Sequence, residues 1–126
     1  MKIELDHIYF SVSDMDKAVK FYEEFLGIKA THREEDRWAD FEIEGQEGMY
    51  FGLINSNALE NKRVVGNNAT LGIYTDNIIK AFEKAKQIGA TILYEPEYIQ
   101  DSPYEYVCFG MLDLDGNMIE IASYKK

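Results

Sequence analysis

Cysteine and long hydrophobic runs are nearly absent from this chain of 126 residues. Cys108 is the single cysteine, so no internal disulfide can form, and we expect a buried, inert thiol in a reducing cytoplasm. No hydrophobic run approaches the roughly 20 residues that span a membrane. The opening MKIELDH also lacks the hydrophobic core of a signal peptide. We therefore predict a cytoplasmic protein without a membrane partner.

Positive charge is also scarce, with 13 Lys and Arg residues against 23 Asp and Glu residues and a formal net charge of −10. Nucleic acid is excluded as a partner because phosphate binding needs a basic stripe, which the sequence lacks. The default interpretation is an acidic, self-repelling surface. A sharper interpretation is an acidic groove that attracts cationic or amine-bearing small molecules.

Two common arrangements of active-site residues are missing. The sequence has no glycine-rich phosphate-binding loop, and none of its serines stands in a nucleophile elbow. The two histidines are His7 and His32, and no motif links either of them to Cys108 as a catalytic dyad. The sequence thus gives no support to a phosphate-binding enzyme or to a serine or cysteine nucleophile.

A strand followed by a helix organises the first half of the chain. Residues 7–12 form a β-prone run, and apolar residues then recur with helical spacing over residues 15–26. Ser13 or Asp14 is expected to cap this helix, and Gly27 suits the left-handed residue that follows the last turn.

The same plan returns in the second half, which indicates an internal repeat. Residues 71–75 read as a strand, Asp76 is expected to cap the next helix, and Gly89 ends it about half a chain length after Gly27. The side chains expected on the inner face of this second helix are Ile78, Ile79, Phe82, Ala85 and Ile88.

The remaining segments complete two βαβββ modules in an α+β fold with mostly antiparallel sheets. The other expected strands are residues 29–35, 38–44, 49–54, 91–98, 106–112 and 118–123. Module one is predicted at residues 1–55 and module two at residues 68–126, joined by an asparagine-rich linker at residues 56–67.

The duplicated module, His7 ahead of SDMDKAVKFYEEFLG, and the closing DLDGNMIEIAS together resemble the vicinal oxygen chelate superfamily. This superfamily includes glyoxalases, bleomycin-resistance proteins, extradiol dioxygenases and fosfomycin-resistance enzymes. The resemblance covers nearly the whole chain. It implies paired βαβββ modules with curved sheets around one cleft, a small-molecule ligand, and commonly a homodimer.

The resemblance also implies a divalent-metal site built from four equivalent positions on the first and fourth strands of the two modules. In this sequence those positions fall on His7, Thr70, Glu120 and a place near Gly52. Neither Thr70 nor Gly52 is a normal metal ligand, so His7 and Glu120 remain as candidates, with Cys108 or His32 as a conceivable third ligand. We expect no required cofactor; the alternative is a weakly held Zn, Ni, Mn or Fe ion.

A simpler interpretation stands beside the metal site. His7 is then a strand-opening histidine that hydrogen-bonds to a neighbour, and Glu120 is a carboxylate that accepts hydrogen bonds from a tyrosine or a backbone N–H. Each residue taken alone favours this simpler interpretation, whereas the resemblance favours their meeting in one cleft.

Aromatic residues form the second group of candidates, with nine Tyr, seven Phe and one Trp. Strand alternation places Tyr9 and Ser11 on the face of His7, and Tyr74 on the face of Thr70. Such a lining suits a small organic ligand, including an amine held by cation–π attraction. The predicted pocket residues are Tyr9, Ser11, Trp38, Tyr50, Thr70, Tyr74, Tyr104 and Tyr106, whereas Phe10, Phe21, Phe25, Phe41 and Phe82 are assigned to the core.

Two functions from different classes follow. The first is a small-molecule-binding protein similar to the bleomycin-resistance branch, favoured by the missing ligands, the acidic balance and the aromatic residues. The second is a metal-dependent enzyme similar to glyoxalase or to a resistance transferase, in which His7 and Glu120 hold a Lewis-acidic metal. We favour the first.

Overall fold

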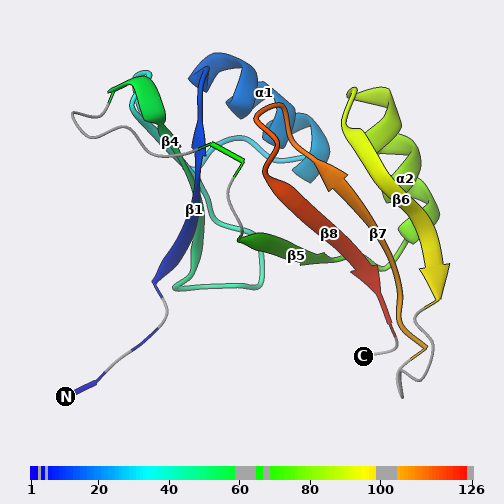
Figure 1. The fold of residues 1–126 in the computed structure, drawn as a ribbon. Coiled ribbons are helices and arrows are strands. Elements are labelled where there is room, and N and C mark those ends of the chain that lie inside the picture. The colour runs from blue at the N-terminus through cyan, green and yellow to red at the C-terminus, as the bar shows by residue number, and fades with distance from the viewer. Residues whose placement is uncertain (3, 5, 59–64, 67–68, 99–104, 125–126) are drawn as a thin grey trace. The chain divides into compact units, whose positions relative to one another are not determined.

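The computed structural model describes residues 1–2, 4, 6–58, 65–66, 69–98 and 105–124. The chain forms two compact units, Met1–Gly66 and Asn67–Lys126. Each unit folds as a four-stranded sheet with one α-helix, and two of the three strand pairings in each sheet are antiparallel (Figure 1). The predicted α+β fold of two βαβββ modules is therefore confirmed. Part of the predicted linker at residues 56–67 lies outside the described residues.

Unit one begins with the strand and helix that the sequence predicted. Its elements are β1 (His7–Val12), α1 (Met15–Leu26), β2 (His32–Glu34), β3 (Trp38–Phe41), β4 (Tyr50–Asn55) and the short 3₁₀ helix η1 (Ser56–Ala58). The sheet order is β1-β4-β3-β2, with β1 parallel to β4. This parallel pairing brings Tyr9 beside Gly52 although the two residues are far apart in the sequence.

The core of unit one lies between α1 and one face of the sheet. Asp14 caps the helix by accepting a hydrogen bond from the Lys17 backbone N–H at 3.0 Å, and Gly27 ends it at φ 72°. The Tyr22 ring contacts the rings of Phe41 and Phe51 on the sheet. The helical residues buried in this core are Met15, Ala18, Val19, Phe21, Tyr22 and Phe25.

Unit two repeats the order of unit one. Its elements are β5 (Thr70–Tyr74), α2 (Ile78–Gln87), β6 (Thr91–Tyr98), β7 (Val107–Leu112) and β8 (Met118–Ser123). The sheet order is β5-β8-β7-β6, with β5 parallel to β8 (Figure 1). The helix ring of Phe82 meets Phe109 of β7 at a centroid distance of 5.2 Å. Buried sheet residues complete this core, namely Phe109, Met111, Ile119 and Ile121.

Two predictions about α2 are wrong. Asn77, not Asp76, caps the helix, because the Asn77 side chain accepts the Lys80 backbone N–H at 3.1 Å while the Asn77 N–H donates to the Thr75 hydroxyl. Ile79 does not face the core but is 58% exposed. Ala85 is the one α2 residue that is buried, so α2 covers its sheet less completely than α1 does.

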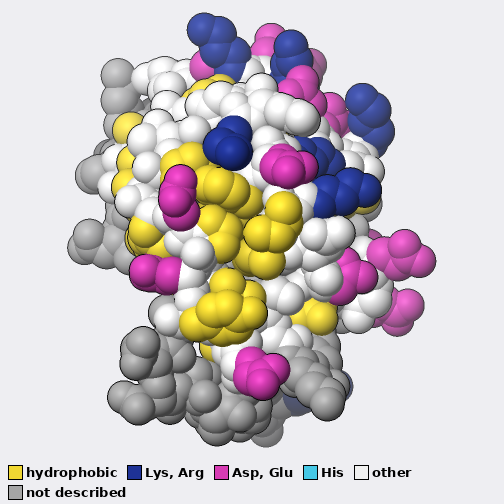
Figure 2. Space-filling model, turned by 90° about the vertical axis from the view of Figure 1, so that its right-hand side faces the viewer, with side chains coloured by type: hydrophobic (Ala, Val, Ile, Leu, Met, Phe, Trp, Pro, Cys, Tyr) yellow, Lys and Arg dark blue, Asp and Glu magenta, His cyan; other side chains and the backbone are white. Residues whose placement is uncertain are grey.

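Part of the outer surface of unit two is hydrophobic. Figure 2 shows hydrophobic side chains gathered on the side of α2 and β6, and the exposed large hydrophobic residues of these elements are Ile79, Leu93 and Tyr98. Among the described residues, none of the helices has the length and hydrophobicity needed to cross a membrane.

Candidate functional site

The face of the unit-one sheet opposite α1 bears three rings in mutual contact. His7 stacks on Tyr9 at a centroid distance of 5.5 Å, and Trp38 meets both rings edge-on, at 5.9 Å from His7 and 5.6 Å from Tyr9. Strand alternation explains the arrangement, because Phe10 and Ala39, the neighbours in sequence, point to the core. We call His7, Tyr9 and Trp38 the aromatic corner.

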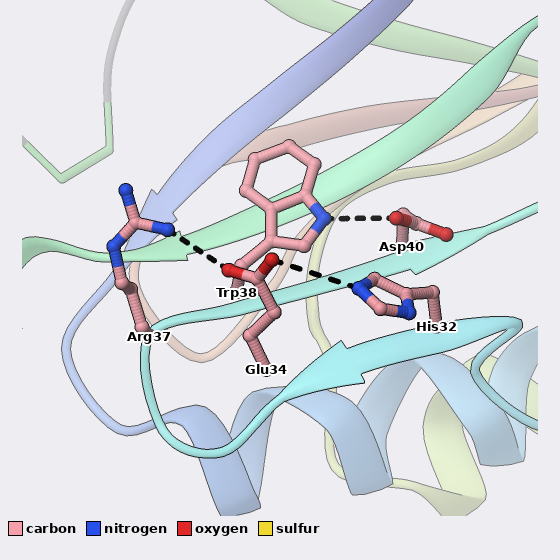
Figure 3. A network of polar contacts seen from close by, with 5 residues as sticks. All are labelled: His32, Glu34, Arg37, Trp38 and Asp40. Carbon is pink, nitrogen blue, oxygen red and sulfur yellow. Dashed lines mark hydrogen bonds and ion pairs between the residues drawn. The ribbon is translucent and has the colours of Figure 1, made fainter.

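Trp38 is held in place by a hydrogen bond and by a glycine. Its indole N–H donates to Asp40 Oδ2 at 2.8 Å (Figure 3). On the neighbouring strand, a Cβ at Gly52 would lie 2.6 Å from the indole Cζ2 and 3.2 Å from the Tyr9 Cβ. Real Cβ atoms do not approach other atoms so closely, so the ring position requires glycine at 52. The indole therefore fills the space in which a metal-binding side chain at position 52 would stand.

A polar network borders the aromatic corner (Figure 3). Glu34 accepts a hydrogen bond from Arg37 at 2.9 Å and lies 3.7 Å from the His32 ring. His32 is directly opposite Asp40 in the β2–β3 pairing. Asp40 Oδ1 is buried without a hydrogen-bond partner among the described residues. This corner therefore holds a carboxylate with unused capacity to accept a hydrogen bond.

His7 itself is paired with its neighbour in the sequence. Its Nδ1 lies 2.7 Å from Asp6 Oδ2, and the His7 side chain remains 37% exposed. This contact is the one expected from the simpler interpretation of His7.

In unit two, Glu120 is bound by a tyrosine. Tyr106 donates its hydroxyl to Glu120 Oε1 at 2.5 Å. Burial, followed by this hydrogen bond, raises the pKa of Tyr106 well above its ordinary value, so the hydroxyl keeps its proton. The Tyr106 ring stacks on Tyr124 at 5.7 Å, and Tyr124 contacts Tyr74 at 5.1 Å. We call Tyr74, Tyr106 and Tyr124 the tyrosine stack.

A second tyrosine crosses a glycine in the same sheet. Tyr94 is opposite Gly110 in the β6–β7 pairing, and a Cβ at Gly110 would lie 2.5 Å from the Tyr94 Cε1. Burial, then the nearby Cys108 and Glu120, raise the pKa of Tyr94 to about 12. Cys108 is 2% exposed, and burial raises the pKa of its thiol. The prediction of a buried thiol is confirmed, and such a thiol is a poor nucleophile.

The strand registers show which of the four implied metal positions in unit one correspond to those in unit two. Gly52 corresponds to Glu120, because Gly52 lies beside Tyr9 in unit one and Glu120 lies beside Gly72 in unit two. His7 corresponds to Thr70, because His7 stands two residues before Tyr9 and Thr70 stands two residues before Gly72. Within the described residues, no group of three or more His, Cys, Asp or Glu side chains is placed to hold a metal ion. With Gly52 covered by Trp38 and with Thr70 as a poor ligand, these residues do not fit the four-ligand metal site.

The remaining predicted site residues divide between the two units. Tyr50 is opposite His7 in the β1–β4 pairing, and Ser11, farther along β1, is 5% exposed. Thr70 is an exposed residue at the start of β5. Tyr104 lies outside the described residues. A single cleft that contains both His7 and Glu120 stays a prediction.

Three residues of these faces were missed from the sequence. Asp40 stands two residues after Trp38, so strand alternation was a usable signal for it. Tyr124 similarly shares the alternation of Glu120 but follows the last strand. Tyr94 had no signal, because its position depends on pairing with Gly110.

Comparison with known proteins agrees with the fold. Residues 4–121 match the Glyoxalase/Bleomycin resistance protein/Dioxygenase superfamily. The chain is 27% identical over 129 residues to Virulence protein STM3117 of Salmonella typhimurium, covering 95% of this chain and 83% of that protein. The crystal structure of that virulence protein has a TM-score of 0.71, with 99% of each chain covered.

A further structure shows the same fold at lower identity. A superfamily member from Sphaerobacter thermophilus has a TM-score of 0.78 at 21% identity, covering 97% of this chain and 98% of that one. Proteins of this superfamily typically bind small molecules. The duplicated βαβββ fold and the match over nearly the whole sequence lead to one conclusion: this chain belongs to the Glyoxalase/Bleomycin resistance protein/Dioxygenase superfamily.

Proposed function

We propose that the protein binds a small organic ligand on the aromatic faces of its sheets and needs no metal to do so. The observation on which this rests is the Trp38 indole lying over Gly52. It replaces a potential metal ligand with a flat apolar surface, and ligand sites are typically lined by such surfaces with a few polar groups.

The aromatic corner has the properties of a ligand-binding surface. Its three rings contact one another, and the Asp40 hydrogen bond fixes the indole, so little side-chain entropy is lost when a ligand stacks on it. Asp40 also places a carboxylate next to these rings. A ligand with an aromatic or cationic group suits this combination.

The number of candidate metal ligands supports the same choice. His7 pairs with Asp6, and Glu120 accepts the Tyr106 hydroxyl. A metal ion held by His7 and Glu120 alone would lack a third ligand to fix its geometry.

The second candidate function is a metal-dependent lyase, isomerase or resistance transferase similar to glyoxalase. One observation favours it: a histidine and a carboxylate stand at two of the four positions that the superfamily pattern implies.

We further propose that the protein is cytoplasmic and that it forms a homodimer. Dimer formation covers the open edges of four-stranded sheets.

Fluorescence of Trp38 tests the proposed function directly, because Trp38 is the single tryptophan in the chain. We would treat the protein with EDTA and titrate it with a panel of small aromatic amines and alcohols. The expected result is saturable quenching that is unchanged by added Zn²⁺, Ni²⁺, Mn²⁺ or Fe²⁺.

The opposite result would be tightly bound stoichiometric metal in protein purified without chelator, together with an activity that His7→Ala or Glu120→Gln removes. That result would establish the metal-dependent enzyme instead.

A further inference from the structure

Unit two has an open space on its sheet next to a fixed carboxylate. Gly72 of β5 is directly beside Glu120 of β8 in the parallel pairing. No heavy atom of the described residues lies within 4 Å of a Cβ built at Gly72. The other two glycines on these sheet faces differ, because Trp38 covers Gly52 and Tyr94 covers Gly110. We call the open space over Gly72 the Gly72 site.

Backbone geometry does not explain the glycine at this position. Gly72 lies within a regular strand and is not among the residues with positive φ. Glycine weakens a strand relative to residues with side chains, and it often marks a place where a ligand approaches the backbone closely. The absence of a side chain at position 72 therefore favours a ligand that occupies this space.

The carboxylate beside the Gly72 site is held in position but only partly used. Tyr106 donates to Glu120 Oε1. Among the described residues, Glu120 Oε2 has no hydrogen-bond partner, and no Lys, Arg or His forms an ion pair with Glu120. Its second oxygen can therefore accept a charge-assisted hydrogen bond from a cationic ligand.

Aromatic rings border the same region. Tyr74 stands two residues after Gly72, on the same face of β5, and Tyr124 joins it to Tyr106. The electron-rich faces of tyrosine rings attract cations. The carboxylate and the tyrosine stack thus favour the same kind of group.

We infer that the Gly72 site binds a protonated amine of the ligand, with the N–H donated to Glu120 Oε2 and the tyrosine stack beside it. This inference rests on the proposed function and adds the class of ligand, an organic ammonium. Glu120 then acts as the acceptor for a ligand cation, in the place where the superfamily pattern implies a metal ligand.

The test compares 2-phenylethylamine with its neutral counterpart 2-phenylethanol, using calorimetry on the EDTA-treated full chain. The amine should bind about tenfold more tightly than the alcohol, because a charge-assisted hydrogen bond replaces a neutral one. Glu120→Gln keeps the shape of the side chain and an acceptor for Tyr106, and it should remove the preference for the amine.

Gly72→Val provides the second arm, since it fills the Gly72 site without strain in the backbone. It should weaken amine binding about tenfold or more while the variant stays folded by circular dichroism. Leu71→Val is the matched control, because it alters the other face of the same strand and should leave the amine affinity unchanged.

The outcomes separate this inference from the proposed function. Equal affinities for amine and alcohol, or amine binding that Gly72→Val leaves intact, would overturn the inference while saturable quenching of Trp38 still upheld the binding function. Absence of binding by either probe, together with tightly bound metal, would overturn both.

Discussion

The indole ring of Trp38 occupies the space that a side chain at Gly52 would need. Gly52→Ala should therefore displace the ring and lower the free energy of unfolding by about 1–3 kcal/mol, the usual cost of overpacking. Urea denaturation followed by circular dichroism measures the loss. The fluorescence maximum of Trp38 should also move to longer wavelength as the ring becomes more exposed.

Gly72→Ala is the matched control for this prediction, since Gly72 also lies within a strand but has open space above it. It should be neutral or stabilising by about 0.5 kcal/mol, because alanine has less conformational freedom than glycine in the unfolded chain. Equal destabilisation by both substitutions would show that the Trp38 contact is not the cause.

Tyr94 predicts how stability depends on alkaline pH. Its pKa is raised from 10 to about 12 in the folded protein. Below pH 10 Tyr94 is neutral in both states, and between about pH 10 and 12 the unfolded chain loses the proton first. The free energy of unfolding should therefore fall across this interval, and urea denaturation at stepped pH measures the decline.

Tyr94→Phe should make this decline shallower. Tyr98→Phe controls for the loss of a hydroxyl elsewhere on β6, where Tyr98 is 74% exposed. If the wild-type protein and Tyr94→Phe lost stability identically from pH 10 to 12, the raised pKa of Tyr94 would be refuted.

Ligand binding should depend on the rings more than on the imidazole. Trp38→Ala and Tyr74→Ala should each weaken the binding of an amine-bearing aromatic compound by about tenfold, since each removes an aromatic surface worth about 1 kcal/mol or more. His7→Ala should leave the affinity nearly unchanged. Calorimetry on each variant gives the three dissociation constants, and a large loss in His7→Ala alone would contradict the prediction.

The helix caps give a prediction within each unit. Asp14→Ala and Asn77→Ala should each cost about 1 kcal/mol, because each removes the acceptor for a backbone N–H in the first helical turn. Asp76 precedes the same helix without capping it, so Asp76→Ala should lower the stability much less than Asn77→Ala. Thermal unfolding of the three variants measures these differences, and a larger effect at Asp76 would reverse the assignment of the cap.

The fold could be predicted because hydrophobic periodicity changes sharply at each element. The switch from alternating to helical spacing after residue 12 located β1 and α1, and Gly27 and Gly89 are both left-handed, at φ 72° and 80°. The two errors in α2 arose where two residues adjacent in the sequence both satisfied the same sequence rule. Asp76 and Asn77 are both good caps, and Ile79 follows Ile78, so the pattern did not choose between them.

The candidate site was less predictable because it depends on pairing between strands. Alternation within β1 correctly placed Tyr9 beside His7. The contact of Trp38 with Gly52 requires the registers of β3 and β4, and the contact of Tyr94 with Gly110 requires those of β6 and β7. Single-strand patterns do not contain that information.

The two parallel strand pairs carry their larger residue on opposite strands. In unit one the first strand supplies the large residue, Tyr9, and the fourth supplies Gly52, whereas in unit two the first strand supplies Gly72 and the fourth supplies Glu120. A larger residue is excluded only in the unit-one pair, because Trp38 and Tyr9 occupy the space over Gly52, whereas the space over Gly72 is open. Exchange of residues between the two halves of the chain would therefore fail at position 52, where a glutamate side chain meets Trp38 and Tyr9. The two copies of the βαβββ module thus share one scaffold but differ in the steric constraint at this strand pair.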